Sequence, residues 1–463
     1  MTTAPNKKFN ELETKGVGRL LWQYALPAIM AMTASSLYNI VDGIFIGQGV
    51  GDAAIMGLAL TTPLMALTAA FGTMVGVGGS TLMSIRLGQH DYSTAKHILG
   101  NVVIMNGVIG VVLAALLFLF LEPILRFFGA SDSTLPHAYD FMTIILAGNV
   151  FTHLYLGLNA LLRSTGRPQQ AMYATFGTVA INLILAPIFI FWLDMGIRGA
   201  ALATILAQFF MLLWQIKLFT HPEQLVCFSR EIMHLEKRIV RESLVIGLPQ
   251  FIINVCACLV AIVITRSMTA YGGDVSVGAF GICNRLIMFI ILVVIGLNQG
   301  MQPIAGYNYG ARRNDRLLAV VKLTALVATC VTTTGFIIGT FFAEPCVTLF
   351  AKDSPELIAE ATHGLHICVL FFPVIGVQIV STAFFQSIGL AKRSIFLSMT
   401  RQMLLLVPAI LILPHFFEDP IDGVWYAQPL SDILSTILSV ILLYLQMKKL
   451  KSTLPEGGKV ATA

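Results

Sequence analysis

The chain has 463 residues, of which 56% are hydrophobic and only 11% are charged, and its formal net charge is +5 at pH 7. A soluble globular protein carries about 25% charged residues, so this composition excludes an ordinary soluble fold. It predicts an integral membrane protein, because a bilayer core is crossed by about 20 mainly apolar residues and many windows of this chain are that apolar. A membrane surface accounts for the small basic excess, so we expect no nucleic-acid partner.

The apolar windows predict twelve membrane-spanning helices, six in each half of the chain, because in lipid the backbone must satisfy its own hydrogen bonds. In chain order the expected spans are 20–46, 57–84, 98–120, 138–162, 170–192, 199–217, 244–266, 278–304, 319–342, 360–386, 394–413 and 424–446. The fold class is therefore an all-α integral membrane protein that lies in the lipid bilayer.

The second half of the chain repeats the first at an offset of about 222 residues. Leu26–Pro27 returns as Leu248–Pro249, and Pro187 returns as Pro408. Two copies of one unit in a very apolar chain are typical of transporters, whose site lies between the copies. We expect an N-terminal tail over 1–16, a first lobe over 17–217, a linker over 218–243, a second lobe over 244–446 and a C-terminal tail over 447–463.

Lysine and arginine are distributed unevenly over the loops of this topology. With both termini in the cytoplasm, 23 of the 29 basic residues fall on the cytoplasmic side, and only Arg126, Arg198, Arg266 and Lys352 fall outside. Since cytoplasmic loops are rich in Lys and Arg, both termini are expected inside. Six spans per copy is an even number, so the copies are parallel repeats. The linker segment 232–240 is either a helix on the inner membrane surface or a solvated connection.

Asp42 is the first candidate functional residue, because an ionisable side chain inside a span is costly and usually functional. A polar stripe at helical spacing leads to it along one face of the first span: Ser35, Tyr38, Asn39 and Asp42. A stripe that ends in a carboxylate suits a proton or cation site. The structural alternative is an aspartate that merely ends a helix at the membrane interface.

Spans five and six carry further oxygen-bearing side chains. Asn182 shares a face with Thr178 and Thr175, and Thr204 shares a face with Gln208. Their amide and hydroxyl oxygens can coordinate Na⁺ or hydrogen-bond a protonated carboxyl. The alternative interpretation is that they hold helices together by hydrogen bonds.

The second copy carries a different set of charges. Asp432 is expected about 10 Å inside the outer end of the last span, with Arg285 at a similar depth, and Arg401 about 10 Å from the inner end of its own span. An ion pair between Asp432 and either arginine would lower the cost of burial. The candidate substrate-binding residues are Ser35, Tyr38, Asn39, Thr178, Gln208, Arg285 and Asp432. For Asp432, a purely structural ion pair is the alternative.

The sequence shows no sign of catalysis or metal binding. The seven cysteines have neither a disulfide framework nor zinc-ligand spacing, and no hydrolase, metalloprotease or kinase motif occurs. We therefore expect no enzyme, no metal site and no cofactor other than a coupling ion. A membrane-embedded enzyme would need a catalytic pair or metal cluster that is not visible.

Several short sequence motifs, taken together and in order, resemble the multidrug and toxic compound extrusion (MATE) family. They are Ala25-Leu-Pro27, Val41-Asp42-Gly-Ile-Phe-Ile-Gly47, Arg163-Ser-Thr-Gly166-Arg-Pro168, Asn182 with Pro187, and Gly196-Ile-Arg-Gly199. Gly300-Met-Gln302-Pro303 followed by Tyr307-Asn308-Tyr-Gly310 is similar to the bacterial MepA-like branch of that family. The resemblance covers about residues 17–446.

The resemblance implies two lobes arranged in a V and a secondary active exporter of organic cation drugs and dyes, driven by inward H⁺ or Na⁺. It implies that Asp42, Asn182 and Thr204 form the coupling-ion site. Two acids that other members carry are absent: one position is Ala186, and the other lies near Cys256–Cys258. Their loss weakens a Na⁺ site more than a one-carboxylate proton switch, so we predict H⁺ coupling and keep Na⁺ as the alternative.

We therefore expect an antiporter that works by alternating access, acts as a monomer and lies in the bacterial inner (cytoplasmic) membrane. A flippase for a lipid-linked saccharide precursor, which belongs to the same superfamily, is the alternative function. It would need a strongly basic central cavity, for which only Arg285 and Arg401 are candidates. A major-facilitator carrier would need its own loop motif after the second span, which Arg86–Asp91 does not supply.

Overall fold

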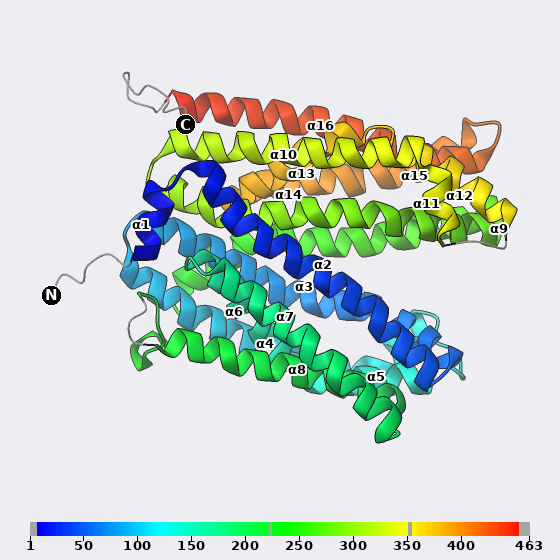
Figure 1. The fold of residues 1–463 in the computed structure, drawn as a ribbon, viewed down its shortest axis with the longest axis horizontal. Coiled ribbons are helices and arrows are strands. Elements are labelled where there is room, and N and C mark those ends of the chain that lie inside the picture. The colour runs from blue at the N-terminus through cyan, green and yellow to red at the C-terminus, as the bar shows by residue number, and fades with distance from the viewer. Residues whose placement is uncertain (1–6, 222–224, 351–353, 453–463) are drawn as a thin grey trace. The chain divides into compact units, whose positions relative to one another are not determined.

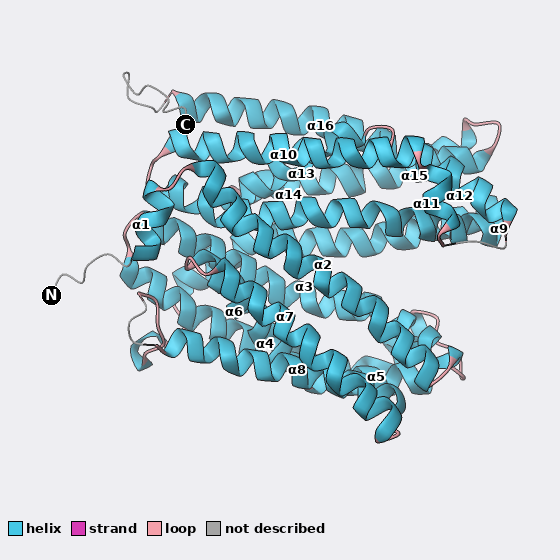
Figure 2. Cartoon of the chain, in the orientation of Figure 1, coloured by secondary structure: helices cyan, strands magenta, loops and turns pink. Residues whose placement is uncertain are grey.

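The computed structural model describes residues 7–221, 225–350 and 354–452, and every regular element in these ranges is a helix (Figure 2). The chain divides into two compact units. Unit 1 contains Met1–Lys15 and Met30–Phe251, and unit 2 contains Gly16–Ile29 and Ile252–Ala463. The expected tails 1–16 and 447–463 and the expected linker 218–243 lie partly outside the described residues, and Lys352 lies wholly outside them.

Two long helices, α2 (Val17–Gly49) and α9 (Lys237–Gly310), contribute to both units (Figure 1). The other helices of unit 1 are α1 (Lys7–Thr14), α3 (Asp52–Gly88), α4 (Tyr92–Phe127), α5 (Leu135–Ala147), α6 (Asn149–Ser164), α7 (Pro168–Pro187), the π-helix η1 (Ile188–Trp192), α8 (Gly196–Thr220) and the 3₁₀-helix η2 (Arg230–Ile232). Those of unit 2 are α10 (Asn314–Phe341), α11 (Ala343–Thr348), α12 (Pro355–Cys368), α13 (Phe372–Ser387), α14 (Ala391–Met399), the π-helix η3 (Thr400–Leu406), α15 (Val407–Ile412), the 3₁₀-helix η4 (Leu413–His415) and α16 (Pro420–Lys451).

The number of helices able to cross a membrane agrees with the twelve expected spans. Within the described residues, nine helical stretches are long and apolar enough, and two bent pairs raise the total to eleven. One of the nine, α9, has 74 residues and is broken at Gly273, where φ is 64°. At 1.5 Å per residue this helix is several times longer than a bilayer core of about 30 Å, so it supplies two spans.

Two of the expected spans are broken rather than straight. Span 138–162 consists of α5 and α6, which meet at an angle of 57°, and span 360–386 consists of α12 and α13, which meet at 59°. The two breaks lie at equivalent places in the two repeats. Gly148 separates the first pair, and Pro373 near the start of α13 follows the second break. Proline disfavours the helical conformation of the residue before it, which explains the second break. The sequence predicted two unbroken spans because the hydrophobic pattern continues through both breaks.

The first span of each repeat starts in one unit and continues in the other. Residues 16–29 of α2 belong to unit 2, and the equivalent residues of α9, up to Phe251, belong to unit 1. Glycines allow the close approach that this requires: a methyl group at Gly247 would lie 1.9 Å from the Met74 carbonyl oxygen, and one at Gly300 would lie 2.5 Å from the Ala25 nitrogen. The boundaries between units therefore fall inside helices.

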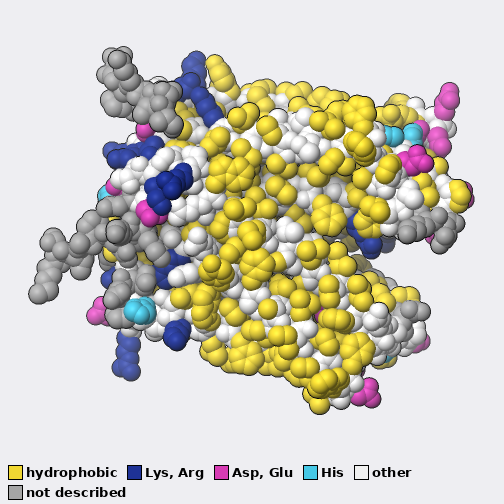
Figure 3. All heavy atoms as spheres, in the orientation of Figure 1, with side chains coloured by type: hydrophobic (Ala, Val, Ile, Leu, Met, Phe, Trp, Pro, Cys, Tyr) yellow, Lys and Arg dark blue, Asp and Glu magenta, His cyan; other side chains and the backbone are white. Residues whose placement is uncertain are grey.

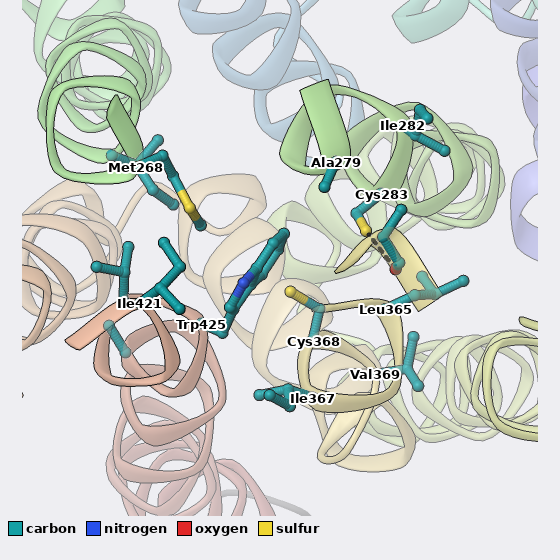
Figure 4. Close-up of a cluster of buried hydrophobic side chains, with 14 of the residues drawn as sticks. Met268, Ala279, Ile282, Cys283, Leu365, Ile367, Cys368, Val369, Ile421 and Trp425 are labelled. Carbon is teal, nitrogen blue, oxygen red and sulfur yellow. Dashed lines mark hydrogen bonds between the residues drawn. The ribbon is translucent and has the colours of Figure 1, made fainter. Parts of the chain in front are cut away.

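Each unit has its own apolar core. In unit 2, Trp425 is 1% exposed and packs among Met268, Cys283 and Cys368 (Figure 4). The Cys283 thiol donates a hydrogen bond to the Ala361 carbonyl oxygen. Many large hydrophobic side chains are exposed, and on the face drawn in Figure 3 hydrophobic atoms cover most of the surface, whereas most of the visible lysines and arginines lie toward the left of the view. All seven cysteines are free, as packing roles would predict.

The described part of the expected linker 218–243 includes helical residues at both of its ends. Helix α8 continues to Thr220 and α9 begins at Lys237, so neither a long surface helix over 232–240 nor a free connection describes this segment. Ile232 is 2% exposed, whereas Met233 and Leu235 are about half exposed. Segment 232–240 thus contains the end of η2 and the start of α9, and it buries Ile232 in unit 1.

Candidate functional site

Three polar side chains from three helices of unit 1 form one hydrogen-bonded cluster. The Asn182 amide of α7 donates to the Tyr38 hydroxyl oxygen of α2 at 3.0 Å and to the Thr204 hydroxyl oxygen of α8 at 3.0 Å. The Tyr38 and Thr204 hydroxyl oxygens lie 3.1 Å apart. Thr204 already donates its single hydrogen to the Ala200 carbonyl oxygen, so Tyr38 is the donor of that contact. The cluster joins helices that are up to 166 residues apart in sequence.

Asp42 lies one helical turn after Tyr38 on α2, close enough for its charge to act on the Tyr38 phenol. One carboxylate oxygen of Asp42, Oδ1, is buried and has no hydrogen-bond partner among the described residues. The Oδ1 atom of Asn182 is also buried without a hydrogen-bond partner among the described residues. Buried polar atoms are nearly always paired, so each of these two oxygens could accept a hydrogen bond from a further donor.

The geometry of α7 changes shortly after Asn182. Pro187 ends the regular part of α7, and the wider π-helix η1 follows directly. Proline cannot donate a backbone hydrogen bond, and π-helical turns are frequent at functional sites. Ala186, where other MATE proteins are expected to carry an acid, is fully buried in the apolar core of unit 1.

The remaining predicted residues of the first repeat do not join this cluster through hydrogen bonds. Ser35 is half-buried and Asn39 is exposed. Gln208 accepts a hydrogen bond from Thr152 of α6. The hydroxyls of Thr175 and Thr178 donate to the backbone of their own helix.

The sequence did not identify two polar partners on α6. Thr152 contacts Gln208, and the buried Tyr155 phenol lies beside the Thr175 and Thr178 hydroxyls. Both partners lie on one face of α6, three residues apart, which is the only signal in the sequence that could have drawn attention to them.

In unit 2 the structure resolves which arginine pairs with Asp432. Arg401 Nε donates to Asp432 Oδ1 at 2.9 Å, and the Asp432 side chain is only 2% exposed. Arg401 lies in the π-helix η3, and its carbonyl oxygen accepts a hydrogen bond from the Ser431 hydroxyl. Asp432 Oδ2 has no partner among the described residues. Arg285 is exposed, and the charge of Arg401 is balanced.

A duplicated all-helical fold with many membrane-spanning helices and polar clusters buried within the spans defines a membrane transporter. The family model MatE matches this chain twice, over residues 27–188 and 249–411, which is once in each repeat. The chain belongs to the MATE family. The prediction of a transporter rather than an enzyme is confirmed, because members of this family are transporters.

Known relatives match over nearly the whole chain. The multidrug export protein MepA of Staphylococcus haemolyticus strain JCSC1435 is 26% identical, over 93% of this chain and 94% of its own length. The solved structure of the MATE multidrug transporter DinF-BH in complex with rhodamine 6G is 33% identical, with a TM-score of 0.88 over 95% of this chain and 98% of that one. An outward-facing structure of a multidrug resistance MATE family transporter is 22% identical with a TM-score of 0.91 over 97% of this chain and 100% of that one, which supports the fold.

Proposed function

We propose that this protein is a multidrug exporter that moves organic cations out of the cytoplasm in exchange for inward H⁺, with Asp42 as the coupling carboxylate. Both termini would lie in the cytoplasm of the bacterial inner membrane. The relatives named for multidrug export and the structure bound to rhodamine 6G support the substrate class. The observation that carries the coupling role is the buried Asp42 Oδ1, which has no hydrogen-bond partner in the described part of the chain and lies on the same helix one turn beyond the Tyr38 of the Tyr38–Asn182–Thr204 cluster.

A proton on Asp42 would change the hydrogen bonding of this region. An ionised carboxylate only accepts hydrogen bonds, and the Asn182 Oδ1 atom also only accepts, so neither can satisfy the other. A protonated carboxyl gains one donor, which such an acceptor can use. Protonation would therefore remove a negative charge and one unpaired acceptor together, and it would favour a different arrangement of α2 against α7 and α8.

The available oxygens favour a proton over a sodium ion. Hard metal cations are held by several oxygen ligands, usually with more than one carboxylate. Asp42 beside the cluster supplies one carboxylate, and the buried Ala186 adds no second one. The Asn182 amide nitrogen, which points at Tyr38 and Thr204, is a donor and repels a cation. A single carboxylate with hydroxyl neighbours is enough for a proton.

Antiport follows if drug and proton prefer different conformations. With Asp42 ionised, the site would accept a cationic drug from the cytoplasm. Protonation from outside would release the drug and reset the transporter. A ligand can shift a conformational equilibrium only by its difference in affinity for the two states, so coupling requires these opposite preferences.

The lipid-precursor flippase receives no support from the charges of unit 2. Such a function needs an excess of positive charge to hold anionic phosphates, but Arg401 is neutralised by Asp432. Arg285 would be left as the single candidate. We therefore prefer export of organic cations.

The test is dye transport by the purified protein in sealed liposomes under an imposed H⁺ or Na⁺ gradient, with rhodamine 6G as the probe. We expect the H⁺ gradient alone to drive transport, and Asp42→Asn to abolish it while the protein still binds the dye and melts within a few degrees of the parent. Driven transport by Asp42→Asn at the parental rate would refute the coupling role. Transport driven by Na⁺ alone would overturn the choice of ion.

The matched control is Asp194→Asn. Asp194 is an exposed aspartate of unit 1 in the turn after η1, with φ of 51°, a left-handed conformation that asparagine also tolerates. The substitution removes the same charge by the same chemistry. We expect this variant to transport normally, so that a loss in Asp42→Asn reflects the site rather than net charge.

A further inference from the structure

Three potential metal ligands lie together where the linker joins unit 1. His97 is in the first turns of α4, and His234 and Glu236 are in the segment between η2 and α9. One ligand atom from each of the three lies within 4.8 Å of the others. Glu236 Oε1 contacts His97 Nδ1 directly and lies 3.5 Å from His234 Nε2. The two imidazole rings meet edge to face, with centroids 5.2 Å apart.

The backbone that carries these ligands is held in place by Asn101, one turn after His97 on α4. Asn101 is completely buried. Its amide nitrogen donates to the His234 carbonyl oxygen at 3.1 Å and to the His97 carbonyl oxygen at 2.8 Å. Its amide oxygen accepts from the Glu236 backbone nitrogen at 2.8 Å. One side chain therefore fixes the main chain at all three ligand positions.

Close packing at the neighbouring residue strengthens this arrangement. A methyl group added at Gly100 would lie 1.9 Å from the Ile232 carbonyl oxygen, so only glycine lets the linker lie directly on α4. Ile232 itself is 2% exposed. A loop fixed to a helix by buried contacts on both sides of its ligands is preorganised, which is what a metal-binding position requires.

We propose that His97, His234 and Glu236 bind one divalent transition-metal ion of the Zn²⁺ type, with water in the remaining position. Two imidazoles and a carboxylate suit Zn²⁺, whereas Mg²⁺ and Ca²⁺ prefer all-oxygen sites. Bonds of about 2.0–2.1 Å to a tetrahedral ion place ligand atoms about 3.3 Å apart. The observed separations of up to 4.8 Å need only side-chain rotation to reach that value.

The sequence could not suggest this site, because His97 is more than 130 residues from the other two ligands and no short ligand spacing exists. Without a metal, the cluster would be an ordinary ion pair between Glu236 and the histidines. The bound ion would tie the start of α9 to α4 in addition to Asn101. The proposal does not depend on the transported substrate.

The test is zinc binding by the full-length protein in detergent, purified through a tag without histidine and stripped with chelator. Calorimetry with Zn²⁺ and elemental analysis should give one ion per chain, and Co²⁺ should give the intense visible bands of a tetrahedral site. We expect His97→Gln and His234→Gln each to weaken binding at least tenfold. We also expect Zn²⁺ to raise the melting temperature of the parent but not of these variants.

The control is His90→Gln. His90 lies near a carboxylate, 3.6 Å from Glu13, but has no second histidine beside that pair among the described residues. We expect this variant to bind zinc as the parent does. The proposal is overturned if the parent binds no stoichiometric zinc, or if His97→Gln and His234→Gln, folded as judged by size-exclusion chromatography, bind as tightly as the parent.

Discussion

The buried ion pair of unit 2 offers a quantitative test of how charge is tolerated inside this fold. Arg401→Met removes the partner of Asp432, whose side chain is 2% exposed and whose second oxygen already lacks a partner among the described residues. Leaving a buried charge uncompensated costs about 3–5 kcal/mol. Instead of staying charged, the carboxylate left without a partner can take up a proton. At pH 7, about three units above the ordinary pKa of an aspartate, this costs about 4 kcal/mol, at about 1.4 kcal/mol for each unit. The loss of stability cannot greatly exceed that value.

The assay is thermal unfolding of the purified protein in detergent, followed by size-exclusion chromatography. At about 2–4 °C for each kcal/mol, the scale for a cooperative unit of about 150–250 residues such as unit 2, Arg401→Met should melt about 6–16 °C below the parent at pH 7. The double variant Arg401→Met with Asp432→Leu should regain most of the loss, because well-packed apolar residues replace a buried pair at little cost.

The control is Asp422→Asn on the same helix. Asp422 pairs with His363 at 2.7 Å, but the two side chains are 32% and 51% exposed. Exposed pairs contribute about 0–1 kcal/mol, so we expect a shift of a few degrees at most. The reasoning is refuted if the double variant melts as low as Arg401→Met, or if Asp422→Asn is equally destabilised.

Three further predictions concern unit 1. Thr204→Val should destabilise the protein by about 1–3 kcal/mol and slow rhodamine 6G transport, because Asn182 and Tyr38 lose the oxygen to which both donate. Thr204→Ser should keep the stability and the transport rate of the parent. Equal melting temperatures and transport rates of the two variants would contradict this. Gly247→Ala should cost about 1–3 kcal/mol of stability and lower the melting temperature, because the added methyl group meets the Met74 carbonyl oxygen. Gly107→Ala, where nothing lies within 4 Å of the added methyl group, should leave the melting temperature unchanged or raise it. Asp91 caps α4 by accepting from the Thr94 nitrogen; burial raises its pKa, but the Thr94 hydrogen bonds and the charges of Arg86 and Arg238 outweigh this and hold the pKa below its ordinary value. Its stabilising contribution should therefore be complete above about pH 4 and fall as the pH drops through the lowered pKa, so Asp91→Ala should lose about 0.5–2 kcal/mol at pH 7 and match the parent at strongly acidic pH.

The membrane fold was predictable because its signals are local and repeated. Apolar windows locate the spans, and the recurrence of Leu26–Pro27 as Leu248–Pro249 shows the duplication. The bends at Gly148 and near Pro373 were not predictable from hydropathy, because apolar residues continue through them. A glycine or proline in a membrane helix is compatible with either a straight or a broken helix.

The candidate site was predictable in part. Asp42, Asn182 and Thr204 were identified because polar groups inside spans are rare, and the structure joins Asn182 to Thr204 directly and both of them to Tyr38. Which arginine faces Asp432 depends on helix packing, and depth along the chain could not distinguish Arg401 from Arg285. The partnership of His97 with His234 and Glu236 depends on how the linker folds back on α4, which no helical periodicity encodes.

The exchange of first-span segments has a mechanical consequence. In α2 the change from unit 2 to unit 1 falls at Ile29–Met30, just after Pro27, and in α9 the change from unit 1 to unit 2 falls at Phe251–Ile252, just after Pro249. Proline removes one backbone hydrogen bond, so each helix lacks one near the point where it passes from one unit to the other. A rigid helix with one weakened point bends there most easily. Any repacking of the half of α2 that carries Asp42 would thus bend α2 at this point, and continuous backbone would serve as the hinge between the two units.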